Sequence, residues 1–163
     1  LHKYDGHFHV GMLGMQYILN ACTICGFNDE AVELLTAAGH PSYREWFDDY
    51  DATTLHEMWV DNASKNHHMF SCPVAWFHNA LLGIKRDERF FTGRRFAVEP
   101  VFPAKIDSIE GEYFTPEGAI KVGWRRDNGR IKLSVGVPEN TVAELKVPGL
   151  ERALIGGNWE FTI

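Results

Sequence analysis

Hydrophobic and polar positions follow two different periods along this chain, and the change falls near residue 92. In the first part, apolar residues recur every three or four positions, which is the spacing of an amphipathic helix. In the second part, apolar and polar residues alternate, which is typical of strands with one buried face. The pattern therefore predicts a helical region over residues 1–91 and a β region over residues 92–163.

Four segments of the first region are expected to be helical. They are residues 7–26, 28–39, 41–47 and 73–83. Gly26 and Gly39 suit the left-handed residue that often closes a helix, and Pro41 suits a first helical turn. Asn28 is placed to cap the second helix, whose first turn then carries two acidic residues. The polar stretch over residues 48–66 is expected to be irregular.

Five to seven short strands are expected in the second region. "GAIKVGWR" and "RIKLSVGV" alternate apolar and polar residues, and the Asp-Asn-Gly sequence between them (127–129) is a hairpin turn signal. The other expected strands span residues 95–99, 105–114, 141–147, 152–155 and 158–163. Many short antiparallel strands separated by prolines and glycines predict a small β-sandwich.

Composition and charge narrow the class of protein. The 163 residues are 45% hydrophobic and 23% charged, which is typical of a soluble globular protein. No apolar run approaches the roughly 20 residues of a membrane helix, and no secretory signal peptide is evident at the start. The net charge is −6, and residues 1–90 hold 12 acidic and 6 basic residues. Because nucleic-acid binding needs clustered Lys and Arg, nucleic acid is not expected as a partner. Because no apolar run is long enough for a membrane helix, a membrane is not expected as a partner either.

Residues 51–70, "DATTLHEMWVDNASKNHHMF", concentrate acid–base chemistry in one segment. They include three carboxylates, three histidines and a tryptophan: Asp51, Glu57, Asp61, His56, His67, His68 and Trp59. Carboxylates and imidazoles bind sugar hydroxyls, and an indole ring packs against the C–H face of a sugar. Glycoside hydrolysis needs two carboxyl groups, one as acid and one as base or nucleophile. The segment therefore predicts a carbohydrate site.

Three runs in this region carry a family resemblance. "GHPSYREWFDDYDATTLHEMW" (39–59), "NHHMF" (66–70) and "VAWFHNALLGI" (74–84) resemble the end of the catalytic domain of bacterial α-L-rhamnosidases, glycoside hydrolase family 78. "GHFHVGMLGMQYIL" resembles the helix that precedes this segment in the family, and the β region resembles the sandwich that follows it. The resemblance implies an α+β multidomain fragment. Antiparallel helices from the end of an (α/α)6 barrel (1–91) would precede a small antiparallel β-sandwich (92–163).

The resemblance also implies roles for individual residues. By position, Glu57 is the general base that activates water in an inverting reaction on α-L-rhamnosides. His67 and His7 match histidines of the family and are expected to bind the sugar, and Trp59 is the best candidate for a sugar platform. His56 stands beside the base, where the family usually has Trp, and is included among the substrate-binding candidates.

The resemblance further implies what this chain lacks and what it would bind. The general acid of the family sits in earlier barrel loops, so the chain is expected to be a C-terminal fragment that is inactive alone. Its expected partners are a rhamnose-containing glycoside and the upstream part of the same enzyme. No cofactor is implied, and the compartment stays open between bacterial cytoplasm, periplasm and secretion.

Other interpretations remain open at this point. Asp51, Ser71 and Val60 depart from the family pattern, as His56 does, and an inactive homologue would fit these changes. Glu57 would also suit a structural role as a cap of loop backbone, and the tryptophans would suit a core.

Two rival functions differ in class from a glycosidase. His7, His9, Glu57 and His67 offer zinc ligands, although no compact His-Glu-x-x-His spacing is present. A non-catalytic carbohydrate-binding or interaction module is the second rival. The Cys22-x-x-Cys25 pair lies in an apolar helical run without a second pair of ligands, which favours buried packing over a zinc or redox site.

Overall fold

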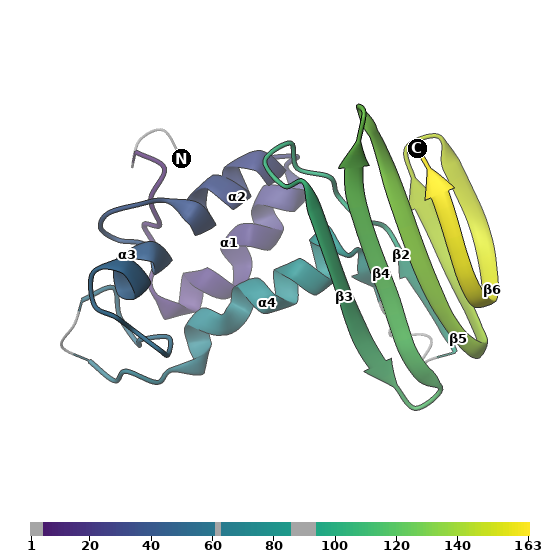
Figure 1. Ribbon diagram of the computed structural model, residues 1–163. Helices are drawn as coiled ribbons and strands as arrows, with labels where there is room; N and C mark the ends of the chain where they lie inside the picture. Colours follow the sequence, from purple (N-terminus) through teal and green to yellow (C-terminus); the bar gives the residue numbers. More distant parts are fainter. Residues whose placement is uncertain (1–4, 61–62, 86–93) are drawn as a thin grey trace. The chain divides into compact units, whose positions relative to one another are not determined.

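The computed structural model describes residues 5–60, 63–85 and 94–163 (Figure 1). It divides into two compact units. The helical unit comprises Leu1–Trp76 with Pro103–Lys105, and the β unit comprises Phe77–Phe102 with Ile106–Ile163. The boundary expected between residues 91 and 92 falls outside the described residues and stays a prediction, as does any role for Asp61. No helix of the described residues is long and apolar enough to cross a membrane.

The described residues of the helical unit form four short α-helices and one 3-10 helix. They are α1 (Met12–Ile24), α2 (Asn28–Thr36), α3 (Tyr43–Asp48), the 3-10 helix η2 (His68–Ser71) and α4 (Cys72–Trp76). α1 buries Met15, Leu19 and Cys22, which lie on one face because they are spaced by four and three residues. The segment between α3 and η2 has no regular structure over its described residues, as expected.

The first helix begins five residues later than predicted. Gly11 occupies the N-cap position with extended backbone, and the helix starts at Met12, so the segment of residues 7–11 leads into it. Phe8 continues the helical spacing of apolar residues but is buried for another reason, because its ring packs against Trp59 and Tyr43. Periodicity alone does not separate these two causes of burial.

The turn between α1 and α2 explains why Asn28 is not a cap. Gly26 has a φ of +80°, the left-handed conformation predicted for a residue that closes a helix. The amide of Phe27 donates to the carbonyl oxygen of Cys22 (2.8 Å) and that of Gly26 to Thr23 (3.1 Å), which together form a Schellman closure. The closure leaves Phe27 as the N-cap of α2, and Asn28 becomes its first helical residue.

The third and fourth helical predictions were correct in place but not in detail. Pro41 precedes α3 instead of opening it, the His40–Pro41 peptide is cis, and Ser42 is the N-cap. α2 ends at Thr36, three residues before Gly39. The helix expected over residues 73–83 consists of α4, which begins at Cys72, followed by the π-helix η3 (Phe77–Leu81) of the β unit. It closes at Gly83, where an added Cβ would lie 2.1 Å from the nitrogen of Pro100.

Six strands are found in the β unit over residues 77–85, 94–102 and 106–163, the part of it that the structure describes. They are β1 (Ile84–Lys85), β2 (Arg95–Val98), β3 (Ser108–Thr115), β4 (Gly118–Asp127), β5 (Arg130–Val147) and β6 (Leu150–Thr162). β3, β4, β5 and β6 form an antiparallel series of hairpins, and β1 pairs antiparallel with β2. β2 pairs in parallel with β5, and the β3–β4 hairpin lies between them along the chain. The sheet is otherwise antiparallel.

Two long strands connect the two layers of the sandwich. The first half of β5 pairs with β4, and its second half pairs with β2. β6 follows β5 along both halves, with an irregularity between Val137 and Val142. Residues 130–137 and 141–147 were expected as two strands, because Pro138 reads as a breaker. The pairing of β5 to β6 is interrupted there and at Gly156, and it resumes at Val142 opposite Ile155.

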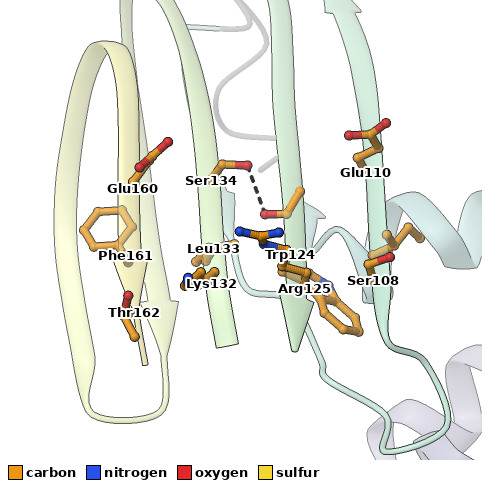
Figure 2. A pocket seen from close by; sticks show the side chains of 12 residues that line it. Ser108, Glu110, Trp124, Arg125, Lys132, Leu133, Ser134, Glu160, Phe161 and Thr162 are labelled. Carbon is orange, nitrogen blue, oxygen red and sulfur yellow. Dashed lines mark hydrogen bonds between the residues drawn. The ribbon is translucent and has the colours of Figure 1, made fainter. Parts of the chain in front are cut away.

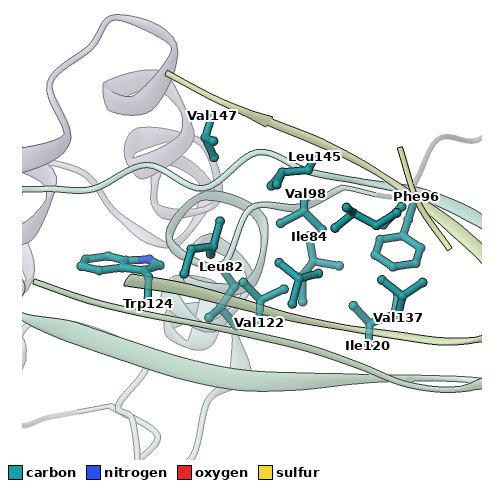
Figure 3. Packing of buried hydrophobic residues seen from close by; sticks show 14 of the residues in the cluster. Leu82, Ile84, Phe96, Val98, Ile120, Val122, Trp124, Val137, Leu145 and Val147 are labelled. Atoms are coloured by element: carbon teal, nitrogen blue, oxygen red, sulfur yellow. The ribbon is translucent and has the colours of Figure 1, made fainter. Parts of the chain in front are cut away.

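Side chains on the strands of this sandwich alternate between two faces. The outward set, on β3, β4, β5 and β6, contributes most of the residues that line an open groove (Figure 2). The other set forms the core between the layers (Figure 3). All of the predicted inward residues on β4 and β5 are buried: Ile120, Val122, Trp124, Ile131, Leu133, Val135 and Val137. The indole nitrogen of Trp124 donates to the carbonyl oxygen of Leu81 (2.7 Å), which satisfies its one polar atom within the core.

Candidate active site

Glu57 and His67 lie on two arms of one irregular loop that run side by side. The amide of His67 donates to the carbonyl oxygen of Leu55 (2.8 Å), and the amide of Glu57 donates to that of Ser64 (2.9 Å). The hydroxyl of Thr54 donates to the carbonyl oxygen of Lys65, which adds a third link between the arms. Main-chain bonding therefore brings the predicted base and the predicted sugar ligand into one small region.

The carboxylate of Glu57 is half-buried and lightly held. Its Oε2 accepts a long hydrogen bond of 3.3 Å from the amide of Ser64. No other hydrogen bond to this carboxylate is found among the described residues. One oxygen is thus left to bind a water or a hydroxyl, while the bond to Ser64 fixes the direction of the side chain. The arrangement meets the needs of a base, and it also contains the backbone cap that a structural role would require.

The ring of His67 is half-buried at the start of η2. It stacks on the exposed ring of His68 with 5.8 Å between the centroids and 13° between the planes. Neither nitrogen of the His67 ring has a hydrogen-bond partner in the described part of the chain. Both nitrogens are therefore open to a ligand hydroxyl.

Trp59 belongs to an aromatic cluster of the helical unit. Its ring stacks on Trp46 (4.8 Å) and Phe8 (5.5 Å), and its edge contacts involve Phe70 and Tyr43. The indole nitrogen donates to the carbonyl oxygen of Val10 (3.0 Å). Much of the ring surface that a sugar platform would present is therefore covered, and the half-exposed remainder is what a sugar would contact.

His56, next to Glu57 in the chain, is buried. It is 3% exposed, and its ring lies 5.2 Å from that of Trp46. Its Nδ1 is buried without a hydrogen-bond partner among the described residues, and so is Nε1 of Trp46. Since the side chain is enclosed, this conformation gives His56 no direct route to a substrate.

The contacts of His7 differ from those of the loop that carries Glu57 and His67. Its Nδ1 is 3.3 Å from the carbonyl oxygen of Pro41. Because a carbonyl only accepts, the proton of a neutral ring lies on Nδ1, and Nε2 is free to accept. His7 also lines a mainly apolar cleft of about 450 Å³ with His9, Cys22 and Cys25, and neither Glu57 nor His67 lines that cleft.

Glu45 is a polar centre that the sequence interpretation missed. It is only 8% exposed, yet its carboxylate accepts hydrogen bonds from Nδ1 of His40 (2.9 Å) and the hydroxyl of Tyr50 (3.0 Å). Its amide donates to the side-chain oxygen of Ser42 (3.0 Å). The S-x-x-E spacing of residues 42–45 is a helix-start signal that would have located it. Glu45 joins the residues before and after α3, immediately ahead of the loop that carries Glu57.

The zinc interpretation finds no support in this geometry. Within residues 5–60, 63–85 and 94–163, no three His, Cys, Asp or Glu side chains are grouped so that they would hold a metal ion. That range includes all four proposed ligands. The thiol of Cys22 is buried and that of Cys25 is exposed, and both are free. Burial and the nearby Glu30 raise the pKa of the Cys22 thiol, so this side chain is a poor metal ligand at neutral pH.

Two family models match the chain in succession. Residues 1–81 match the "bacterial alpha-L-rhamnosidase 6 hairpin glycosidase domain", and residues 83–161 match the "bacterial alpha-L-rhamnosidase C-terminal domain". An α-L-rhamnosidase from Formosa agariphila is 30% identical over 93% of this chain, which spans 17% of that relative's length.

Solved structures share the fold. The α-L-rhamnosidase from Streptomyces avermitilis, complexed with L-rhamnose, superposes over 99% of this chain and 18% of its own, with a TM-score of 0.85 and 21% identity. The native enzyme from Aspergillus terreus superposes over 99% and 20%, with a TM-score of 0.89 and 22% identity. At these identities, the likeness concerns the fold.

Proposed function

The chain belongs to the bacterial α-L-rhamnosidase family, and from this premise we propose that it is part of an inverting glycoside hydrolase acting on α-L-rhamnosides. The observation that carries the proposal is the pairing of the two loop arms, which sets Glu57 and His67 close together within the matched region. The relative from Streptomyces avermitilis, which was solved with L-rhamnose, supports rhamnose as the sugar.

In this proposal Glu57 is the general base. An ionised carboxylate with one unengaged oxygen accepts a proton from a water, which then attacks the anomeric carbon from the face opposite the leaving group. The weak bond from the Ser64 amide orients the carboxylate without occupying both oxygens. An inverting reaction also requires a general acid about 6.5–9.5 Å from the base. Since the chain spans 17% of the length of its curated relatives, we place that acid in another part of the enzyme.

His67 and His7 are assigned to substrate binding. The open nitrogens of His67 suit a hydrogen bond to a sugar hydroxyl near the base. In His7, the bond to Pro41 leaves Nε2 as an acceptor for a hydroxyl. Trp59 mainly holds the loop through its aromatic contacts, and its exposed part remains a proposed sugar contact.

The test is the Glu57→Gln variant in the full-length enzyme. The amide keeps the shape and removes the base, so kcat for a rhamnoside should fall by about 10²–10⁴ with KM nearly unchanged. Glu139→Gln, the same change at an exposed carboxylate of the β unit, is the matched control and should retain full activity. NMR of the first-formed rhamnose should show the inverted anomer. Near-normal turnover by Glu57→Gln would exclude Glu57 as the base.

A second measurement separates the proposed roles of base and ligand. His67→Ala should raise KM more than it lowers kcat, because it removes a binding contact present in both ground and transition states. The isolated 163-residue chain should show no turnover, because it is proposed to lack the acid. Measurable hydrolysis by this chain would contradict the proposal that the general acid lies in another part of the enzyme.

A further inference from the structure

A polar groove of about 930 Å³ crosses four strands of the β unit (Figure 2). The strand register arranges its outward side chains in two rows. The first row is Ser108, Arg125, Lys132 and Thr162, and the second is Glu110, Gly123, Ser134 and Glu160. Each row takes one residue from each of β3, β4, β5 and β6. Apart from the glycine, all of these residues are exposed.

Small residues occupy the centre of the groove. Gly123 lies in its centre beside Ser134, whose hydroxyl donates to the carbonyl oxygen of Gly123 (3.1 Å). Gly136 lies two residues past Ser134 on the same face of β5, just beyond the residues that line the groove. A Cβ on Gly123 would lie 3.2 Å from the Ser134 hydroxyl, and a Cβ on Gly136 would lie 3.1 Å from Cβ of Lys121. These close approaches favour glycine at both positions, and the result is a backbone surface that a flat ligand can approach closely.

Charges around this floor are separated. Arg125 and Lys132 are direct cross-strand neighbours, an arrangement of like charges that is unfavourable by itself. Lys132 pairs with Asp127, and this pairing, with help from Arg125, lowers the pKa of that carboxyl group. Arg125 forms no ion pair with any described residue. Glu110 and Glu160 stand on the outer strands β3 and β6, and neither forms an ion pair within the described part of the chain.

We propose that this groove binds an acidic oligosaccharide, with a carboxylate or sulfate group at Arg125 and Lys132. The guanidinium group of Arg125 offers two parallel donors to such an anion, and Lys132 supplies a second cation. The sugar rings lie over the floor at Gly123 and Ser134. Glu110 and Glu160 accept hydrogen bonds from ring hydroxyls. The inference concerns the β unit alone and does not depend on the assignment of Glu57 as base.

The first test uses the 163-residue chain labelled with ¹⁵N. A tetrasaccharide of galacturonic acid is titrated against it, beside the same tetrasaccharide reduced at its carboxyl groups and a sulfated neutral tetrasaccharide. Saturable shifts of the Gly123 and Ser134 amides with an anionic sugar, at least about tenfold weaker with the reduced one, support the proposal. The anionic sugar that binds identifies carboxylate or sulfate as the ligand group. Equal binding of the reduced sugar, or no shift with any of the three, overturns it.

A matched pair of lysines on β5 provides the second test. Lys132 and Lys146 are equally exposed (46% and 47%), and each pairs with a carboxylate, Asp127 and Glu99. Lys132→Gln should weaken binding by about tenfold, the loss of one charge-assisted contact, while Lys146→Gln should leave it unchanged. Equal losses in the two variants would show non-specific charge attraction and overturn the site. Thermal unfolding of both variants confirms that each is folded. If the groove binds the anionic sugar but the full-length enzyme shows no rhamnosidase activity, the proposed function is rejected and this inference stands.

Discussion

The hydroxyl of Tyr43 donates a 2.7 Å hydrogen bond to the main-chain carbonyl oxygen of Phe70. This contact joins the start of α3 to the 3-10 helix that follows His67, so the far end of the candidate loop is held from the interior. Both residues are buried, and burial raises the pKa of the Tyr43 hydroxyl above its ordinary value. The hydroxyl therefore stays protonated and keeps donating throughout the neutral pH range.

Tyr43→Phe should destabilise the helical unit. The variant keeps the ring contacts with Phe8, Trp46 and Trp59 and leaves only the buried carbonyl oxygen of Phe70 without its partner, which costs about 1–3 kcal/mol. Urea unfolding of the 163-residue chain measures the change. Tyr17→Phe, at a site that is 67% exposed, is the control and should be nearly neutral. Equal stability of the two variants would show that the bond contributes nothing.

Glu45→Gln should destabilise the region before the candidate loop. The carboxylate accepts from His40 and Tyr50 in a buried position, and an amide in its place loses the charge-assisted bond and introduces a donor facing Tyr50. The expected loss is about 1–3 kcal/mol in the free energy of unfolding. Asp48→Asn removes an exposed carboxylate paired with Arg44 on the same helix and should cost about 0.5 kcal/mol or less. The prediction is rejected if the two changes have the same effect.

The stability of the β unit should depend on the charge of Glu99. The hydrogen bond from Lys85, followed by the contribution of Lys146, lowers the pKa of Glu99 below its ordinary 4.5. A lowered folded-state pKa means that the stabilisation is present above the unfolded pKa and is lost as pH falls through the folded pKa. Glu99→Gln should therefore be less stable than the unmodified chain at pH 7, and the gap should narrow as the pH falls below 4.5 and through the lowered pKa of Glu99. Denaturant unfolding at several pH values checks this, and a constant gap would contradict it.

The sequence alone predicted those features of the fold that have a single local physical cause. Alternation at Ile120, Val122 and Trp124 predicted the buried face of β4 because strand geometry alone sets that period. Gly26 was identified as a closing residue because few other residues adopt its backbone conformation at little cost. Both features are local, and a single sequence contains the information that determines them.

Features that depend on distant partners were not accessible in this way. Phe8 lies at a helical spacing from the apolar residues of α1, but its burial comes from aromatic partners far along the chain. The predicted first helix was therefore wrongly extended to residue 7. Pro138 marked a break, but pairing to β6 carries β5 past it. Sequence proximity and family resemblance singled out Glu57 and His67, while the main-chain bonds that place them on adjoining arms were not predictable. Glu45 was missed because its role depends on its burial and on its hydrogen bonds to His40 and Tyr50, which its position in the sequence does not show.

His56 offers a direct choice between binding and packing. Its ring is enclosed against Trp46, and its buried Nδ1 has no partner in the described part of the chain, which is a cost to the folded state. His56→Leu removes that polar atom at nearly the same volume, so the free energy of unfolding should stay equal or rise by about 1 kcal/mol. His68→Leu, at the exposed neighbour of His67, is the control and should change stability little.

The same His56 variant tests the expectation that this residue contacts substrate. If its role is packing, His56→Leu in the full-length enzyme should keep KM within about twofold, because an enclosed side chain makes no contact with the sugar. If it binds substrate, KM should rise by about tenfold or more, the loss expected for one hydrogen bond to a buried partner. The enclosed position favours the first result. A large rise in KM with unchanged stability would instead require the loop to open and expose His56 when the sugar binds.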